Sequence, residues 1–115
     1  MTDEPRAWEL YLYIKKDGQL YRQMTQSIIH NYAIKKIKGT YDPQKAIKGW
    51  VNLVEEGLAR YKKEYRGYAV VHTVDMGTKI LAAKHLADAY AEELANKVKQ
   101  LRALKATGKA WQRRV

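Results

Sequence analysis

The stretch from Asp42 to Tyr65 constrains the fold more than any other part of the chain. Asp42 and Pro43 form a helix-start signal, because a carboxylate can cap the first amides and proline has no amide to leave unpaired. Arg66-Gly67 marks the expected end. Apolar residues recur between them at helical spacing, namely Ala46, Trp50, Leu53, Val54, Gly57, Leu58, Tyr61 and Tyr65. A stripe with such large rings predicts a helix that other helices cover.

A second helix is predicted from Gln19 to Lys38, with Gly39 as the left-handed residue that ends it. Its apolar positions are Leu20, Tyr21, Met24, Ile28, Ile29, Tyr32, Ala33 and Ile37. Few residues separate this helix from the next, so the two are expected to pack as an antiparallel hairpin. The helix dipole explains why Lys35, Lys36 and Lys38 occupy the last turn.

A first helix is predicted to precede this pair. Asp3 or Glu4 before Pro5 is typical of a helix start, and Asp17-Gly18 suits its end. Within residues 8–14 the apolar side chains recur in a nearly alternating pattern, so a short strand is the alternative to a helix. The absence of a second convincing strand favours the helix.

The longest helix is predicted from Met76 to Lys105, with Asp75 as its cap. Residues 68–72 before it are rich in β-branched side chains and are interpreted as a packed loop, with a brief extended segment as the alternative. The predicted fold is therefore all-α, a small bundle of about four helices with a long basic C-terminal helix. Residues 1–106 form its single domain, and residues 107–115 form a basic tail.

The aromatic composition predicts a shallow core. The chain has nine Tyr and three Trp but no Phe, so most large core side chains carry a polar group that needs a partner. It has no Cys, no signal-peptide pattern and no run near the roughly 18 apolar residues of a membrane span. We therefore expect a soluble, cytoplasmic protein without membrane contact.

The charge distribution points to a polyanionic partner. The formal net charge is +10, and no acid follows Glu93. The basic and stacking residues after it are Lys97, Lys99, Arg102, Lys105, Lys109, Trp111, Arg113 and Arg114. Lysine and arginine meet phosphates, and a tryptophan can stack on a base, so this segment predicts non-specific binding of DNA or RNA. Alternatively, the basic residues favour the helix dipole and Trp111 folds onto the core.

Other candidate sites are weaker. Arg60, Lys62, Lys63 and Arg66 alternate with glutamates that can pair with them at i,i+4, so this cluster is interpreted as a solvated face. His30, His72 and His85 lack metal-ligand spacing, although His85 shares a helical face with Asp88 and Glu92. No glycine-rich phosphate loop and no isolated carboxylate pair is present. We therefore predict no metal, no cofactor and no catalysis.

Part of the chain resembles a group of small helical proteins from bacteriophages and other mobile elements, for which no activity is assigned. The resemblance covers about residues 10–66. Its motifs are Lys16-Asp17-Gly18-Gln19-Leu20-Tyr21-Arg22-Gln23, Gly39-Thr40-Tyr41-Asp42, Lys45-Ala46, Trp50 and Tyr61-Lys62-Lys63-Glu64-Tyr65, with a looser echo in Ala87 to Leu94. It implies a mobile-element setting and a helical fold. The basic segment from Lys97 onward lies outside it.

Two hypotheses for function follow. The first is a nucleic-acid-binding accessory protein of a phage or mobile element, which contacts phosphates through its basic C-terminal helix and tail. The second is a non-enzymatic protein-binding module, such as an inhibitor or assembly component, that docks its basic, Tyr-rich surface onto an acidic partner. Association into a homo-oligomer through an uncovered apolar helical stripe is a further option.

Overall fold

The computed structural model describes residues 3–64 and 74–106, and all regular structure in these ranges is helical. The elements are α1 (Glu4–Lys16), α2 (Gly18–Leu20), the π-helical turn η1 (Tyr21–Thr25), α3 (Gln26–Lys38), α4 (Pro43–Glu64), α5 (Met76–Ala89) and α6 (Ala91–Ala106). The all-α prediction is confirmed. The interpretations of residues 68–72 and 107–115 lie outside the described ranges.

Short-range start and stop signals set most helix ends. The carboxylates of Asp3, Asp42 and Asp75 each accept a hydrogen bond from a backbone amide in the following turn, at 3.1, 3.0 and 2.7 Å respectively. Gly39 ends α3 in the left-handed conformation, with φ of 76°. Residues 8–14 belong to α1, which excludes the strand alternative. These signals were predicted correctly because each depends on neighbouring residues alone.

The predicted single helix from Met76 to Lys105 is wrong, because the chain turns at Tyr90. The backbone of Tyr90 leaves helical geometry, with φ of −102° and ψ of 8°, and separates α5 from α6. The apolar stripe continues through this turn, so periodicity alone does not reveal it. The break allows α5 to pack mainly against α4 and α6 mainly against α3. The bundle consequently has more helices than the four predicted.

The predicted helix from Gln19 to Lys38 is continuous but contains an irregular turn. In η1 the amide of Gln26 donates to the carbonyl of Tyr21, five residues earlier, as in a π-helix. Leu20 and Thr25 are consequently both buried although they are five positions apart. Met24, which was predicted for the buried stripe, is only half-buried.

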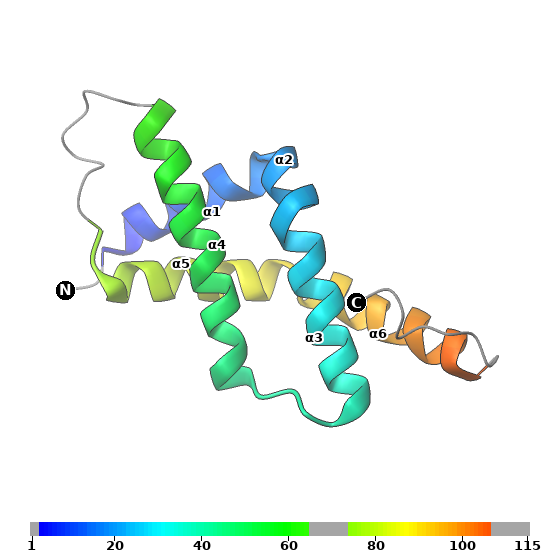
Figure 1. The fold of residues 1–115 in the computed structure, drawn as a ribbon. Helices are drawn as coiled ribbons and strands as arrows, with labels where there is room; N and C mark the ends of the chain where they lie inside the picture. Colours follow the sequence, from blue (N-terminus) through cyan, green and yellow to red (C-terminus); the bar gives the residue numbers. More distant parts are fainter. Residues whose placement is uncertain (1–2, 65–73, 107–115) are drawn as a thin grey trace.

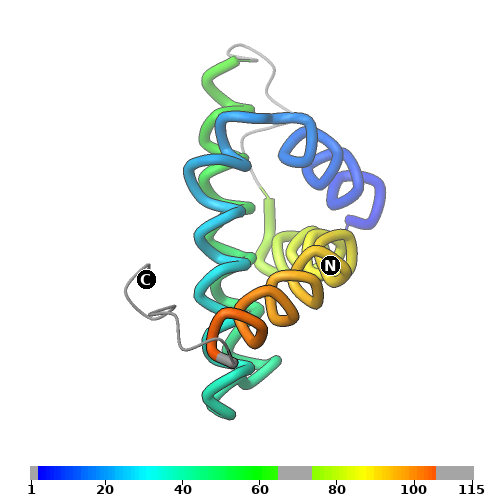
Figure 2. Tube along the Cα trace, turned by 90° about the vertical axis from the view of Figure 1, so that its right-hand side faces the viewer, coloured from blue at the N-terminus to red at the C-terminus, as the bar shows by residue number. Residues whose placement is uncertain are grey.

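The helices form two layers. Figures 1 and 2 show α3 and α4 running antiparallel in one layer, while α5 and α6 cross them in the other. The two helices of the predicted hairpin therefore run antiparallel, as expected. The packing of the hairpin differs, because α3 and α4 touch each other less than they touch the second layer. The first helix, α1, packs against α5 and α4.

Trp50 joins the two layers at the centre of the core. It is 2% exposed, and its ring stacks on Tyr90 with centroids 5.9 Å apart and planes at 5°. Tyr32 from α3 meets the same indole edge-on at 6.1 Å. The Tyr32 hydroxyl donates to the carbonyl of Ala46, 2.6 Å away, so this buried ring finds the polar partner it needs.

No helix in the described part of the chain is long and apolar enough to cross a membrane.

Candidate nucleic-acid interface

Two acid-free segments lie side by side in the fold. Residues 18–41, which include α3, contain no Asp or Glu, and none follows Glu93 in α6. These segments are far apart in the sequence, but α6 packs mainly against α3 (Figure 1). The packing therefore gathers cations from two segments without interleaved acids. A surface of this kind attracts polyanions.

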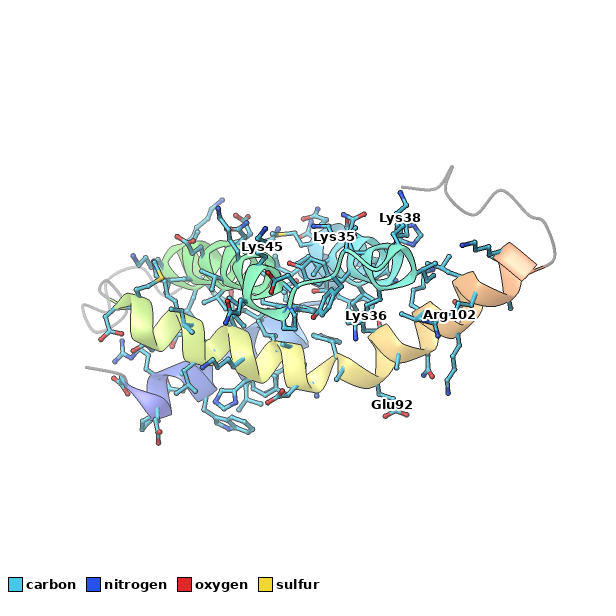
Figure 3. The ribbon with its side chains drawn as sticks, turned by 90° about the horizontal axis from the view of Figure 1, so that it is seen from below. Lys35, Lys36, Lys38, Lys45, Glu92 and Arg102 are labelled. Carbon is cyan, nitrogen blue, oxygen red and sulfur yellow. The ribbon has the colours of Figure 1, made fainter. Side chains whose placement is uncertain are left out.

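We call the resulting region the basic end. Its described cations are Lys35, Lys36 and Lys38 in α3 and Lys97, Lys99, Arg102 and Lys105 in α6, and Lys45 and Lys48 extend it along the start of α4. Asp42 is the one acid in residues 26–48 and 94–106, and its carboxylate caps α4. Figure 3 shows Lys36, Lys38 and Arg102 at the end where α3 meets α6, while Glu92 points away from them.

Aromatic rings orient two lysines of the basic end. The ammonium nitrogen of Lys36 lies 4.7 Å from the centre of the Tyr41 ring, and that of Lys35 lies 5.9 Å from the Tyr32 ring. Burial raises the pKa of both tyrosines above the ordinary value, so the rings remain neutral at physiological pH. Cation–π contacts hold an ammonium group without cancelling its charge. Lys35 and Lys36 therefore remain available to an anionic ligand.

The acids of four ion pairs in the described part of the chain lie elsewhere. The pairs are Arg6 with Asp3, Arg60 with Asp17 and with Glu56, and Lys79 with Glu55, at nitrogen–oxygen distances of 3.6 to 3.8 Å. None of these four involves a cation of the basic end. These pairs balance charge on α1, on α5 and on residues 55–60 of α4, whereas the cations of α3, and of α6 after Glu93, have no acid interleaved with them.

The structure brings together only part of the predicted binding segment. Lys99, Arg102 and Lys105 are exposed on α6, and Lys97 is half-buried beside α3. Lys109, Trp111, Arg113 and Arg114 lie outside the described residues. Sequence reasoning missed the contribution of α3 and α4, because the helix dipole already explained Lys35, Lys36 and Lys38. The acid-free run from 18 to 41 was the available signal.

The second basic cluster is separate from the basic end. Arg60 pairs with Glu56 at 3.6 Å, which confirms the predicted i,i+4 pairing. It also donates to the side-chain oxygens of Gln19 and Gln23, at 3.0 and 2.9 Å. Arg60 thus holds α4 against the start of the α2–α3 segment, and its role is structural. Figure 1 shows this end of α4 on the far side of the molecule from the end of α6.

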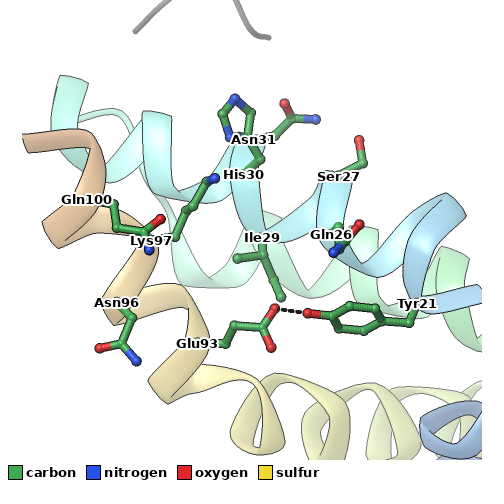
Figure 4. A pocket seen from close by; sticks show the side chains of 10 residues that line it. All are labelled: Tyr21, Gln26, Ser27, Ile29, His30, Asn31, Glu93, Asn96, Lys97 and Gln100. Carbon is green, nitrogen blue, oxygen red and sulfur yellow. Dashed lines mark hydrogen bonds between the residues drawn. The ribbon is translucent and has the colours of Figure 1, made fainter. Parts of the chain in front are cut away.

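A groove of about 740 Å³ runs between α3 and α6, next to the basic end. Its polar lining consists of four carboxamides, two hydroxyls, one carboxylate, one imidazole and one ammonium group, and Figure 4 shows how these side chains lie on the α2–α3 segment and on α6. They belong to Gln26, Asn31, Asn96 and Gln100, to Ser27 and Tyr21, and to Glu93, His30 and Lys97. We call it the amide groove. It was not predicted, since its two walls come from helices whose pairing the sequence does not reveal.

A hydrogen bond crosses one end of the amide groove. The Tyr21 hydroxyl donates to Oε2 of Glu93 over 2.5 Å (Figure 4). This bond to a carboxylate, followed by burial, raises the pKa of Tyr21 above its ordinary value. The contact joins the π turn η1 to α6. Within the described chain, Oε1 of Glu93 accepts no hydrogen bond and remains open to a donor.

The histidines do not assemble a metal centre in the described ranges. His85 packs among aromatic rings, 5.2 Å from Trp8 and 5.7 Å from Tyr11 between ring centres. His30 lines the amide groove, and His72 lies outside the described ranges. No group of three or more His, Cys, Asp or Glu side chains in residues 3–64 and 74–106 could hold a metal ion.

No protein-family model, curated protein or solved structure matches the chain.

Proposed function

We propose that this protein is a nucleic-acid-binding accessory protein of a phage or mobile element, acting in the cytoplasm and contacting phosphates through the basic end. The observation that supports this function is the packing of α3, which contains no acid, against α6, which contains no acid after Glu93. Phosphate backbones present a dense row of negative charges, and binding to them releases counterions. The proposed surface extends the predicted C-terminal segment to include Lys35, Lys36, Lys38, Lys45 and Lys48.

Non-specific contact is the form of binding that this surface favours. Its cations are mostly lysines, which are compact, flexible point charges suited to phosphate oxygens rather than to two-point recognition of a base. The described helices also form no recognised DNA-reading motif such as a helix-turn-helix pair. Affinity is therefore expected to depend strongly on salt and weakly on duplex sequence.

The test measures binding to labelled DNA and RNA oligonucleotides over a range of salt concentrations. Replacing Lys36 and Arg102 together by Gln removes one cation from each helix and should lower the salt slope by about two. The double variant Lys62→Gln/Lys63→Gln removes the same charge from the C-terminal end of α4, far from the basic end, and serves as the control. Absence of binding at low salt, or an equal loss in the control, would contradict the proposal.

A protein-binding module is the second candidate, and exposed apolar residues on α1 support it. Trp8 is 49% exposed and Leu12 is 36% exposed, and exposed tryptophans often anchor interfaces. The predicted Tyr-rich surface has less support, because the seven tyrosines in the described ranges are all buried or half-buried. A complex that survives nuclease treatment and is lost in Trp8→Ala would favour this function over the first.

A further inference from the structure

The amide groove carries a pattern that differs from the other exposed helical faces. Asn96 and Gln100 are one turn apart on α6, and Ser27 and Asn31 are one turn apart on α3. Each helix therefore contributes a pair of uncharged polar side chains to the lining of the groove. The exposed face of α4, in contrast, carries mostly charged side chains, namely Lys45, Lys48, Glu55, Glu56, Lys63 and Glu64. Charged side chains would be enough to keep a helical face solvated. Hydration alone therefore does not explain why these positions carry amides.

Carboxamides suit one part of a nucleotide in particular. Each offers both hydrogen-bond donors and an acceptor, which is the combination that pairs with the edges of nucleobases. The basic end begins directly beside the groove, because Lys97 belongs to both. A ligand with anionic groups outside and hydrogen-bonding edges inside therefore fits the two surfaces together.

Glu93 sets the orientation of such a ligand. Its carboxylate repels a phosphate from the groove, while its Oε1 can accept a hydrogen bond from a base. Exocyclic amino groups, as on cytosine, are suitable donors to a carboxylate. The hydrogen bond from Tyr21 fixes the position of this carboxylate. Phosphates are thus directed toward Lys97 and the basic end, and the base toward Glu93.

We infer that the amide groove binds an unstacked nucleobase of single-stranded nucleic acid, with bases that carry an exocyclic amino group preferred. This inference rests on the proposed function. A duplex keeps its base edges paired and stacked, so its bases cannot enter a groove between two helices. The basic end contacts phosphates of either form, whereas the groove discriminates between them.

The experiment compares labelled oligo-dC, oligo-dT and a duplex, each about twelve nucleotides long. Asn96→Ala should weaken oligo-dC binding about tenfold, leave duplex binding unchanged and leave the salt slope unchanged, because it removes hydrogen bonds but no charge. The matched control is Asn52→Ala, which removes an exposed amide from α4, outside the groove. Melting temperatures of both variants check that each remains folded.

The outcomes separate this inference from the proposed function. If oligo-dC and oligo-dT bind equally, or if Asn96→Ala weakens duplex and single strand alike or neither, the groove does not bind a base. Loss of binding in Lys36→Gln/Arg102→Gln would then still support phosphate contact by the basic end. Failure of every oligonucleotide to bind at low salt overturns both.

Discussion

At the scale of single residues, Trp50 is the side chain that joins the two layers of the core. Its ring lies between Tyr90, from the α5–α6 turn, and Tyr32, from α3, and is 2% exposed. Trp50→Ala removes both ring contacts and leaves a cavity, so it should lower the free energy of unfolding by about 3 to 5 kcal/mol. Denaturant unfolding measures the loss. Unchanged stability with loss of a binding partner would instead make Trp50 an exposed anchor.

Gly49 is a second critical position, because the Tyr32 side chain from α3 lies against α4 there. A Cβ at residue 49 would overlap the Tyr32 hydroxyl. Alanine normally stabilises a helix relative to glycine, by roughly 0.5 to 1 kcal/mol. Here we expect Gly49→Ala to destabilise the protein by about 1 to 3 kcal/mol, since the overlap forces the ring or the helix to move.

Thermal unfolding of a double variant checks this cause. Tyr32→Phe removes the overlapping oxygen, although it also removes the hydrogen bond to Ala46. Adding Gly49→Ala to Tyr32→Phe should therefore cost less than adding it to the original protein. Equal costs in the two backgrounds would show that the hydroxyl is not the obstacle.

At the scale of elements, local signals could be predicted from the sequence and tertiary ones could not. Asp3, Asp42, Asp75 and Gly39 act on their own turns, and all four set helix ends as expected. The turn at Tyr90 depends instead on α5 and α6 finding different partners. The π turn likewise cannot be predicted before it is known which positions of the helix from Gln19 to Lys38 are buried.

The junction between α4 and the α2–α3 segment depends on Arg60. Its guanidinium reaches Gln19 and Gln23 at 3.0 and 2.9 Å and lies 3.6 Å from Asp17. Arg60→Ala should cost about 1 to 2 kcal/mol, because several hydrogen bonds to one charged group are lost at a partly solvated site. Arg60→Lys should recover little of this, since lysine lacks the planar fork that reaches two amides.

Chemical denaturation of these variants measures the contribution. Lys63→Ala is the matched control, because it removes an exposed cation from the same end of α4 without these contacts. A cost for Arg60→Ala no greater than that of the control would show that the contacts do not stabilise the junction.

At the scale of the whole molecule, the separation of charge follows from packing rather than from any one segment. The part of the basic end in α6 was predictable, since Lys97, Lys99, Arg102 and Lys105 follow the last acid. The part in α3 was not, because the helix dipole also explained Lys35, Lys36 and Lys38. The amide groove needs both helices at once. The periodicity of the sequence predicts which face of a helix is apolar, but it does not predict which other helix covers that face.

The fold as a whole should lose stability in alkali, because its rings link several helices. The tyrosines with raised pKa include Tyr21, through its bond to Glu93 and then burial, and Tyr32 and Tyr90, through burial first. A folded pKa above the unfolded value of about 10 means that the folded state disfavours the phenolate. The stabilising contribution is therefore complete below pH 10 and is lost as pH rises through the folded pKa values.

The denaturation midpoint measured from pH 8 to pH 11.5 tests this sign, with phenolate absorbance followed in parallel. Lysine deprotonation acts in the opposite direction over the same range, because it relieves repulsion at a net charge of +10. A midpoint that falls above about pH 10 therefore identifies the tyrosines as the dominant groups. Tyr21→Phe removes one of them without burying a new polar group, so its midpoint should fall less steeply. A flat or rising midpoint would mean that relief of repulsion at the basic end outweighs the cost of ionising the rings.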